Sequence, residues 1–397
     1  MHPFFASSAC QITPCDRCDN PKHGTEVLRF TEVTTEIYQQ YCERLQTAGF
    51  TLYTKKAVVG NCFATYTTPL FTAHLAYYSA IAEMRVIHGP RGYLPPLTPS
   101  PTDQMVTPTF TQMMLIEGGQ SNVVQLSDGS FLIVDGGKKN DTDRDNLLAF
   151  LMAHKPPQHE KPHIAAWLIS HAHNDHVHLC QEFLLDYGDR VELALFGYNF
   201  PDFESSIIHS ETEVSQRIWQ SRMKKILDEH FPTTKRWVMH SGERLPLPGC
   251  KVEVLMTWED FWPQLMKTVN QTSFCIRLHF DSGKTVMLPT DAWTGLEEQM
   301  VTVYGDYLKS DVLQATHHGL AGGLIPFYEK VSPAVVFWPS PENRFAALEP
   351  IPIPGREKPI AIVRQFEPSR WLLENVKRHY HHGETVTIDA NNLNVIP

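Results

Sequence analysis

The sequence predicts an α+β protein in which a main domain of two packed β-sheets, with helices outside, follows a smaller α+β module. Strand-like apolar runs occur in two successive series, within residues 113–196 and 236–338, and helical segments lie between them. Two such series imply two sheets that pack face to face. A proline-dense stretch at residues 94–101 (LPPLTPSP) separates this region from the first part of the chain as a stiff linker.

Composition and charge describe an ordinary globular protein. Hydrophobic residues make up 42% and charged residues 20% of the 397 residues, and the formal net charge is −10. This acidic balance, without a Lys/Arg run, gives no strong signal for nucleic-acid binding. No run approaches the ~18 apolar residues of a membrane helix, and no secretion signal is evident. Eight scattered cysteines suit a reducing compartment, so we expect a cytoplasmic protein. The acidic balance favours a small-molecule substrate, and the sequence leaves the oligomeric state undetermined.

Residues 1–25 carry Cys10, Cys15, Cys18 and His23. The two-residue gap between Cys15 and Cys18 is that of zinc ribbons and knuckles, so these four side chains could hold one structural zinc ion. The alternative is a flexible tail with incidental thiols. We favour the tail because a second pair with this spacing is absent.

Residues 26–97 form the predicted small α+β module. Thr34 is the expected N-cap of a helix at residues 35–48, where apolar residues recur at helical spacing, and Gly49 is the expected stop. A helix followed by consecutive strands predicts an antiparallel sheet with the helix on one face. The expected strands are residues 50–55, 62–67, 72–78 and 84–88, and the linker extends over residues 98–107.

The main domain is expected over residues 108–397. Strands of the first series are expected at residues 113–118, 121–126, 130–134, 164–169 and 192–196, with helices at 144–154, 177–187 and 211–230. Strands of the second series are expected at residues 236–239, 251–256, 273–280, 284–289, 311–316 and 334–338, with helices at 295–304 and 323–330. A helix at residues 371–377 and a strand at 384–389 are expected to close the second sheet.

The most informative stretch is SHAHNDH at residues 170–176, directly after a buried strand. His171 and His173 project to one side of an extended segment, because side chains alternate with period two. Asp175 and His176 follow where the chain bends into the next helix. Imidazole and carboxylate groups are ligands that borderline divalent metals prefer, so these four side chains could serve two adjacent ions. The alternative is a solvated histidine-rich loop.

Two further strands of the second series end in polar side chains of the same kinds. Asp291 follows the strand at residues 284–289, and His317 and His318 follow the strand at 311–316. Ligands placed just past strand ends converge on one rim of the core. A carboxylate such as Asp291 can bridge two cations, and two cations about 3.5–4 Å apart can clamp a hydrolytic transition state. Taken singly, each of these residues would more often be structural.

These motifs resemble, in their order, the successive motifs of the metallo-β-lactamase superfamily. The resemblance rests on Asp135-Gly136-Gly137, the HxHxDH stretch, Asp291 and His317-His318-Gly319, and it extends over about residues 108–340. It implies a four-layer αββα sandwich with one or two zinc ions, or Mn²⁺ or Fe²⁺ in their place.

The resemblance also implies a role for each of these side chains. Asp175 and Asp291 are the expected catalytic residues, because Asp175 would orient a metal-bound water and Asp291 would bridge the metals. Asp135 would steady a ligand histidine, and His318 would support a ligand or contact substrate. The expected ligands are His171 and His173 for the first metal, Asp175, His176 and His317 for the second, and Asp291 for both.

One departure from the superfamily pattern concerns the first metal. The family usually supplies a third histidine before the bridging aspartate, whereas this chain has the sequence NQTS at residues 270–273. This arrangement, together with Asp311-Val312-Leu313 and His317-His318-Gly319, resembles the branch that contains the metallo-β-lactamase-like domains of bacterial DNA-uptake (competence) channel proteins, and phosphorylcholine esterases are similar. Asn270 would stand where the missing histidine goes, and its weak amide ligand predicts a labile first metal. His240 and His279 are alternative ligands.

A histidine-containing turn and one cysteine lie outside these motifs. The turn His381-His382-Gly383 is expected on the surface, although it could reach the rim of the site. Cys180 lies four residues after His176 on the predicted helix and is expected to be a packed thiol rather than a ligand.

The function that the resemblance implies is metal-dependent hydrolysis by a metal-bound hydroxide. No GxSxG or other nucleophile motif competes with this reading. The branch resemblance favours a phosphodiester, and the acidic balance favours a small one. The alternatives are hydrolysis of a lactone, thioester or β-lactam, and a non-catalytic metal-binding or regulatory protein of the same fold, which Asn270 supports.

Overall fold

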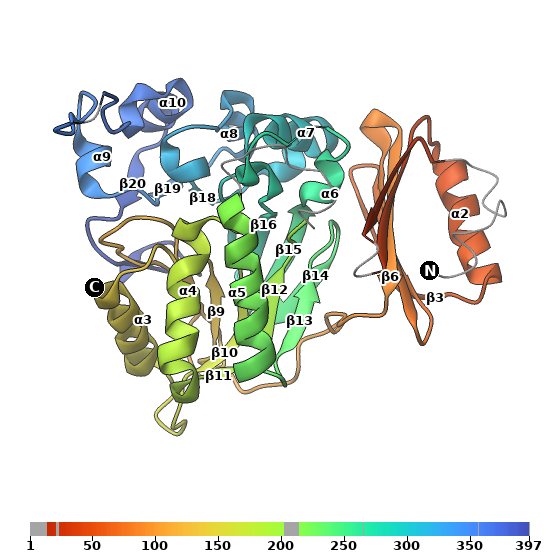
Figure 1. Ribbon diagram of the computed structural model, residues 1–397, viewed down its shortest axis with the longest axis horizontal. Coiled ribbons are helices and arrows are strands. Elements are labelled where there is room, and N and C mark those ends of the chain that lie inside the picture. Colours follow the sequence, from red (N-terminus) through yellow and green to blue (C-terminus); the bar gives the residue numbers. More distant parts are fainter. Residues whose placement is uncertain (1–13, 21–23, 202–213, 265, 356, 397) are drawn as a thin grey trace.

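The computed structural model describes residues 14–20, 24–201, 214–264, 266–355 and 357–396. It contains a smaller N-terminal module, at the right in Figure 1, and a larger main domain. Cys10 and His23, proposed above as zinc ligands, lie outside the described residues.

The N-terminal module is an antiparallel sheet in the order β1-β2-β6-β5-β4-β3, with one helix on one face (Figure 1). The helix α2 (Thr35–Thr47) begins as predicted, because the Thr34 hydroxyl accepts a hydrogen bond from Ile37 N at 3.3 Å. The predicted antiparallel sheet with a helix on one face is present. Its strands are β1 (Asp16–Asn20), β2 (Thr25–Phe30), β3 (Thr51–Val58), β4 (Asn61–Thr67), β5 (Phe71–Tyr78) and β6 (Glu83–Pro90).

The prediction of a tail up to residue 25 is wrong for residues 16–20. They form β1, which pairs with β2 in the register Cys18↔Val27. Their polar sequence hides the strand, because it is held by cross-strand ion pairs, Arg29 with Asp16 at 2.7 Å and Arg17 with Glu26, rather than by apolar alternation.

The central strands of the module's sheet are buried on both faces. One face packs on α2, with Phe30, Tyr41 and Tyr66 in a common core. The other face packs on the main domain, where Tyr78 OH donates to Asp260 Oδ1 at 2.7 Å. Asn61 Nδ2 likewise donates to the carbonyl of Val303 at 2.7 Å, and this asparagine is fully buried. Buried contacts of this kind fix the module to the main domain.

The main domain has two sheets that share an apolar core. The first has the order β13-β12-β10-β9-β8-β7-β21-β22 with β11 beside β10, and the second has the order β14-β15-β16-β17-β18-β19-β20. Phe110 and Val124 of the first sheet pack against Ile276 and Phe337 of the second. The strands of the first sheet are β7 (Thr109–Gln112), β8 (Asn122–Gln125), β9 (Phe131–Val134), β10 (His163–Leu168), β11 (Glu192–Leu193), β12 (Leu195–Tyr198), β13 (Lys235–Val238), β21 (Val386–Asp389) and β22 (Val395–Ile396).

The strands of the second sheet are β14 (Arg244–Leu247), β15 (Cys250–Met256), β16 (Cys275–Phe280), β17 (Thr285–Leu288), β18 (Val312–Gln314), β19 (Val335–Trp338) and β20 (Arg378–His381). Helices cover the outer face of each sheet, so the four layers run α, β, β, α (Figure 1). The predicted fold class is therefore confirmed. Over the first sheet lie α3 (Asp141–His154), α4 (Asn174–Tyr187) and α5 (Val214–His230), and over the second lie α6 (Trp258–Phe261), α7 (Thr294–Tyr304), α8 (Ile325–Val331) and α10 (Glu367–Asn375), with α9 (Glu342–Ala346) beside them.

Two of the predicted strands are wrong in place or partner. Residues 113–118 are loop, and the strand lies earlier, at β7. Met113 and Leu115 are buried against the helix layer, so their apolar character reflects packing rather than a strand. The strand near residues 384–389 does not close the second sheet: β21 pairs with β7 in the first sheet, and the unpredicted β20 pairs with β19 instead.

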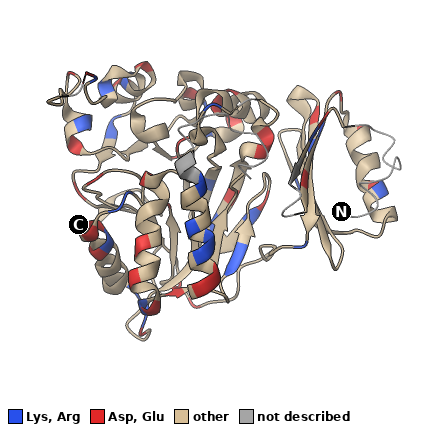
Figure 2. Ribbon diagram, viewed as in Figure 1, with Lys and Arg blue, Asp and Glu red and all other residues tan. Residues whose placement is uncertain are grey.

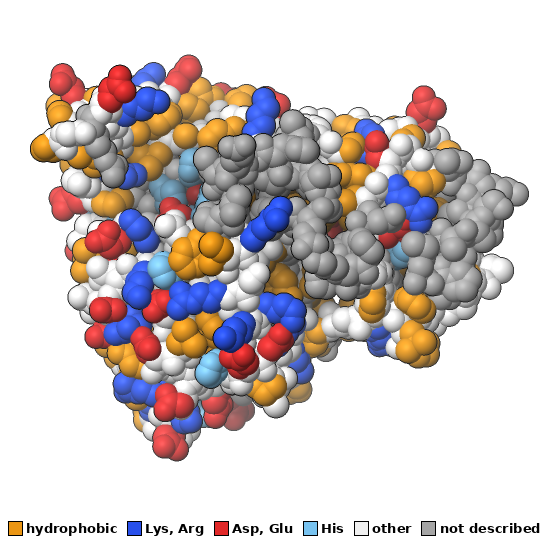
Figure 3. Space-filling view, in the orientation of Figure 1, with side chains coloured by type: hydrophobic (Ala, Val, Ile, Leu, Met, Phe, Trp, Pro, Cys, Tyr) orange, Lys and Arg blue, Asp and Glu red, His pale blue; other side chains and the backbone are white. Residues whose placement is uncertain are grey.

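Charges of both signs are interspersed over the molecule (Figures 2 and 3). The basic residues of α5 are paired: Arg222 with Glu182 at 2.5 Å and Lys224 with Asp228 at 2.6 Å. This pattern offers no continuous basic track on the face shown. Among the described residues, no helix combines the length and the apolar character needed to cross a bilayer.

Candidate metal centre

The two sheets deliver their polar residues to one rim. Strands β9, β10, β12 and β13 run parallel, so their carboxyl ends meet at the same edge of the first sheet. Phe274 N donates to Ser170 O at 3.2 Å, which ties this edge to the loop before β16 of the second sheet. Within the second sheet, His317 N donates to Thr290 O at 2.9 Å and joins the loops after β17 and β18. The convergence that the strand ends predicted is present.

The backbone at this rim is strained at four residues. Asp135, Thr290, His317 and His318 all have φ between 48° and 61°, a left-handed conformation that non-glycine residues seldom adopt. Each such residue costs about 1–3 kcal/mol, and such strain persists at functional sites because the surrounding structure holds it.

Two glycines allow the first turn of α4 to approach the rim closely. A Cβ at Gly119 would collide with the carbonyl of Asp175, and a Cβ at Gly136 would collide with Cys180. Gly136 N donates to His176 O at 2.7 Å, which fixes the helix start. Cys180 is a buried free thiol packed against Gly136, in agreement with its expected role.

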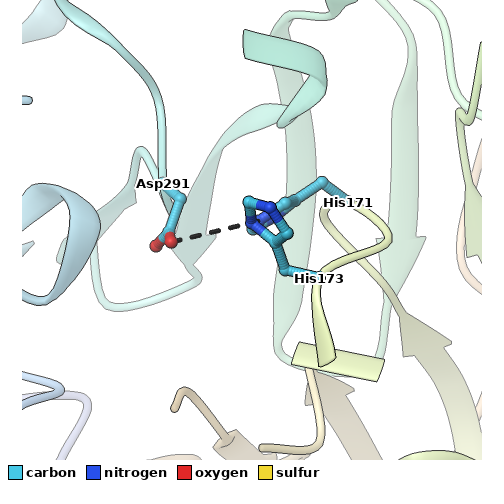
Figure 4. A group of neighbouring side chains, drawn as sticks. All are labelled: His171, His173 and Asp291. Carbon is cyan, nitrogen blue, oxygen red and sulfur yellow. Dashed lines mark hydrogen bonds and ion pairs between the residues drawn. The ribbon is translucent and has the colours of Figure 1, made fainter. Parts of the chain in front are cut away.

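The first of two His/Asp groups consists of His171, His173 and Asp291 (Figure 4), whose candidate ligand atoms lie within 4.8 Å of one another. His171 Nε2 is 3.9 Å from Asp291 Oδ2. It is also 2.8 Å from His173 Nδ1, so the two imidazoles hydrogen-bond to each other. We call these residues the first group.

The second group consists of Asp175, His176 and His318. His318 Nε2 is 3.4 Å from Asp175 Oδ2. Asp291 Oδ2 lies 3.2 Å from His176 Nε2 and 3.3 Å from His318 Nε2, as well as facing the first group. One carboxylate oxygen therefore stands between the two groups.

Outer hydrogen bonds orient the histidines of the second group. His176 Nδ1 donates to Asp135 Oδ2 at 2.8 Å, and Asp135 also accepts from Ser170 N at 2.7 Å. His318 Nδ1 donates to the carbonyl of Pro339 at 2.8 Å. Because Nδ1 of each ring is occupied, Nε2 is the atom that faces Asp291. Asp135 therefore makes the contact that the motif predicted for it.

The geometry favours His318, whereas the sequence led us to expect His317 as the ligand. His318 lies with Asp175 and His176, whereas His317 belongs to neither group and its Nε2 is 3.7 Å from Asp291 Oδ2. The strand-based prediction assumed that the first residue past β18 points into the site. The left-handed backbone at both histidines removes that simple alternation.

Asn270 reaches the site through His317. Its Nδ2 is 3.2 Å from His317 Nε2, and its Oδ1 is buried without a hydrogen-bond partner. The alternative ligands His240 and His279 do not reach either group: they pair with Glu259 at 2.8 Å and Glu253 at 2.7 Å.

Two residues near the centre were not assigned from the sequence. The Trp293 ring lies 5.4 Å from that of His317, without any sequence signal beyond its place two residues after Asp291. His382 is buried, and its backbone N donates to Ser340 O at 3.1 Å, while Ser340 Oγ donates to His318 O. The paired histidines at residues 381–382 were the signal for it.

Burial and neighbouring charges perturb the site strongly. Burial lowers the pKa of His171 well below its usual range. Burial opposes the charged form of His318, but Asp291 and Asp175 outweigh it and raise its pKa to about 10. Burial also opposes ionisation of Asp291, yet the imidazoles of His318 and His176 hold its pKa well below its usual range. Protonated imidazoles thus balance the buried carboxylates, a task that cations can take over.

The donor set fits divalent cations. His176 Nε2 and His318 Nε2 are buried and lie within ion-pair distance of Asp291 Oδ2 without hydrogen-bond geometry, and Asp291 Oδ1 is buried without a hydrogen-bond partner. Such an unpartnered buried oxygen calls for a ligand. Imidazole nitrogens with carboxylate oxygens are the usual ligands of zinc and of related first-row metals. Both groups could therefore hold a metal ion.

No protein-family model matches the chain, and neither does any curated protein. Similar solved structures include CmlA, a diiron β-hydroxylase from Streptomyces venezuelae (13% identity, TM-score 0.41, 73% of this chain and 55% of that one). A second is the metallo-β-lactamase fold protein YhfI from Bacillus subtilis (15% identity, TM-score 0.35, 58% of this chain and 85% of that one). A third is human tRNase Z, short form (13% identity, TM-score 0.32, 58% of this chain and 91% of that one).

The match spans 55% of the length of CmlA, and at this level of similarity no activity or ligand set follows for the present chain. The four layers and the order of the rim residues agree with the architecture that the resemblance to the metallo-β-lactamase superfamily implied, and membership of that superfamily stays a prediction. The resemblance to the DNA-uptake and phosphorylcholine esterase branch stays a prediction.

Proposed function

We propose that this protein is a metal-dependent hydrolase with a small phosphodiester as substrate. The observation that carries the proposal is the position of Asp291, whose Oδ2 faces His176 and His318 at 3.2 and 3.3 Å and His171 at 3.9 Å. A carboxylate shared by two groups of ligands suits a pair of cations.

The first group, which includes Asp291, would hold one ion, and the second group together with Asp291 would hold the other. When bound, divalent cations supply Lewis acidity and activate water near neutral pH. Zinc is the ion that this mixture of imidazole and carboxylate ligands favours, with Mn²⁺ or Fe²⁺ as alternatives.

The chain's own side chains do the positioning. Asp135 fixes the ring of His176, and the carbonyl of Pro339 fixes that of His318. Asn270 and His317 stand beside Asp291 and present an amide and an imidazole to whatever binds there. The Asn270 amide can donate a hydrogen bond to an oxygen of a phosphodiester, whereas His317 donates through Nδ1 to the carbonyl of Ala321 and accepts from Asn270 at Nε2.

The charge of the protein favours a small substrate. The net charge is −10, and on the face shown in Figure 3 charges of both signs are interspersed among the described residues, which does not favour a long polyanion. A small phosphodiester needs only the cations of the rim. Lactone, thioester or β-lactam hydrolysis would use the same groups. A non-catalytic metal-binding role is the second candidate, which Asn270 and the contact between His171 and His173 support.

The test is metal analysis of the purified protein together with turnover of bis-p-nitrophenyl phosphate and nitrocefin. We expect two metal equivalents and phosphodiester turnover, lost in His173→Ala and retained in the matched control His163→Ala at the start of β10. A metal-free protein that is inert toward both substrates would overturn the proposal. Bound metal without turnover would favour the non-catalytic candidate, and turnover of nitrocefin alone would replace the substrate class.

A further inference from the structure

We propose that a cavity between the N-terminal module and the main domain binds a small planar molecule with one negative charge. The cavity has a volume of about 270 Å³. Its wall comes from β5 and β6 of the module, including Thr72 and His74, and from the ends of β12 and β13 and from α6 of the main domain, including His240 and Trp258. Sites between domains are common places for small ligands.

The cavity is separate from the metal centre although both lie at one edge of the first sheet. Strand β12 lies between β10 and β13, and all three run parallel. Asn199 and His240 therefore leave the sheet at the same edge as His171. The cavity wall nevertheless contains no residue of the first or second group. The cavity therefore lies beside the metal centre, on the side of the N-terminal module.

Several aromatic rings line the cavity. The Tyr198 and Phe200 rings are 5.1 Å apart, and Tyr93 and Trp258 also line the cavity. Trp258 Nε1 donates to Asn199 Oδ1 at 2.8 Å, which fixes the indole. A planar ring is the ligand shape that such walls favour, because offset and edge-to-face packing add to the apolar burial.

Polar groups converge on the same space. The His74 and His240 rings lie with centroids 4.0 Å apart and are tilted by 31°, and His240 Nδ1 donates to Glu259 Oε2 at 2.8 Å. Thr72 also lines the cavity, and its hydroxyl is buried without a hydrogen-bond partner. A buried polar atom in this position calls for a partner, which a ligand can supply.

The charges of the wall select the sign of the ligand. Arg236 and His240 are positively charged residues of the wall. Burial opposes the charge of His240, but Glu259 and its acidic neighbours outweigh burial and raise the pKa of His240. His74 is neutral, since burial and the nearby His240 lower its pKa. His88 is paired with Glu26 at 2.6 Å.

Glu259 balances His240. Outside the cavity, Asp228 is shared between Arg236 at 2.5 Å and Lys224 at 2.6 Å, so these three side chains keep one net positive charge beside the wall. A monoanion completes the balance. The volume is near the lower end of the ~300–1,000 Å³ of small-molecule sites, which fits one or two fused rings.

Calorimetric titration of the full chain with 2-naphthoate tests the proposal, with uncharged 2-naphthamide as the matched ligand. We expect 2-naphthoate to bind at one site and the amide to bind about tenfold more weakly, because one charge-assisted hydrogen bond is lost. Absence of 2-naphthoate binding, or equal binding of the amide, would overturn the proposal.

Two variants locate the binding. Gly92 lines the cavity, its φ is ordinary and a Cβ there meets open space, so Gly92→Phe adds a bulky side chain at the cavity wall without backbone strain. It should abolish binding, and Arg236→Gln should weaken binding about tenfold. Arg190→Gln, at the opposite end of the first sheet, should change nothing. Unchanged binding in Gly92→Phe would contradict the assignment.

Binding requires no turnover, so this proposal and the proposed hydrolase fail separately. In Asp291→Asn, 2-naphthoate should bind as in the wild type. Loss of binding in that variant would show that the ligand sits at the metal centre and would overturn the cavity assignment.

Discussion

The two His/Asp groups of the metal centre differ in how their ligand atoms are held. In the second group, Nδ1 of His176 and of His318 is occupied by Asp135 and by the carbonyl of Pro339, so each Nε2 faces Asp291. In the first group, His171 Nε2 and His173 Nδ1 bond to each other at 2.8 Å. The second group is preorganised, whereas the first must break an internal hydrogen bond before its nitrogens can bind a cation.

This difference indicates unequal affinities. Preorganised ligands spend less free energy on ordering when they bind, so the second group should hold its ion more tightly. The first group has no third histidine, and Asn270 lies where the motif leads one to expect it. A tightly held ion and a labile ion are therefore expected on the two sides of Asp291.

Removing the shared carboxylate should have the largest effect. Asp291→Asn keeps the shape but takes the charge from both groups, so we expect less than one tightly bound metal equivalent and a loss of phosphodiesterase activity of more than about 1,000-fold. Elemental analysis and initial rates measure these outcomes, with Asp281→Asn on the exposed β16–β17 turn as control. Two retained equivalents would remove Asp291 from the bridging position.

The adjacent histidines allow the second group to be broken selectively. His318→Ala should weaken the tightly held ion by more than about 100-fold, since loss of a direct ligand exceeds the ~10–100-fold cost of losing a supporting contact. His317→Ala should weaken it by less than about tenfold. Both residues have left-handed φ, so the backbone strain is matched. Competition with a chromogenic chelator measures both affinities, and the reverse order would restore the sequence-based preference for His317.

Glu297 beneath the second group gives a pH dependence of stability. It is buried, it accepts a hydrogen bond from Thr316 Oγ1 at 2.6 Å, and burial raises its pKa to about 8. Because the folded protein binds this proton more tightly than the unfolded chain, its stabilising contribution is complete below about pH 4.5 and is lost as the pH rises toward 8.

The matched variant is Glu297→Gln, which cannot ionise. Relative to this variant, the wild type should lose about 3 kcal/mol of unfolding free energy between about pH 6 and pH 8, at about 1.4 kcal/mol per pH unit. Urea unfolding at each pH measures the difference. A constant difference would show that Glu297 is ionised throughout.

The smallest expected effect is a gain at the first group. Asn270→His supplies an imidazole in place of a weak amide ligand, and we expect the labile ion to bind about tenfold more tightly. Asn375→His at the end of α10 is the control for an added surface histidine. Unaltered affinity of the labile ion would mean that position 270 does not face it.

The sequence by itself determined the elements with strong local signals. The helix α2 begins at its predicted cap, and the strand before Ser170 ends where its polar residues begin, because capping and apolar runs are local properties of the chain. The same kind of local pattern, a polar residue just after an apolar strand, identified the candidate ligands His171, His173, Asp175, His176 and Asp291. The structure places all five together.

Only the tertiary structure decided which partners these elements meet. The strand β21 joins the first sheet and β20 the second, although nothing in either short strand specifies its sheet. His318 rather than His317 joins Asp175, because loop hydrogen bonds and a left-handed backbone direct the rings. The cavity beside His240 exists because two bodies distant in sequence pack together. These outcomes depend on long-range packing, which local periodicity does not encode.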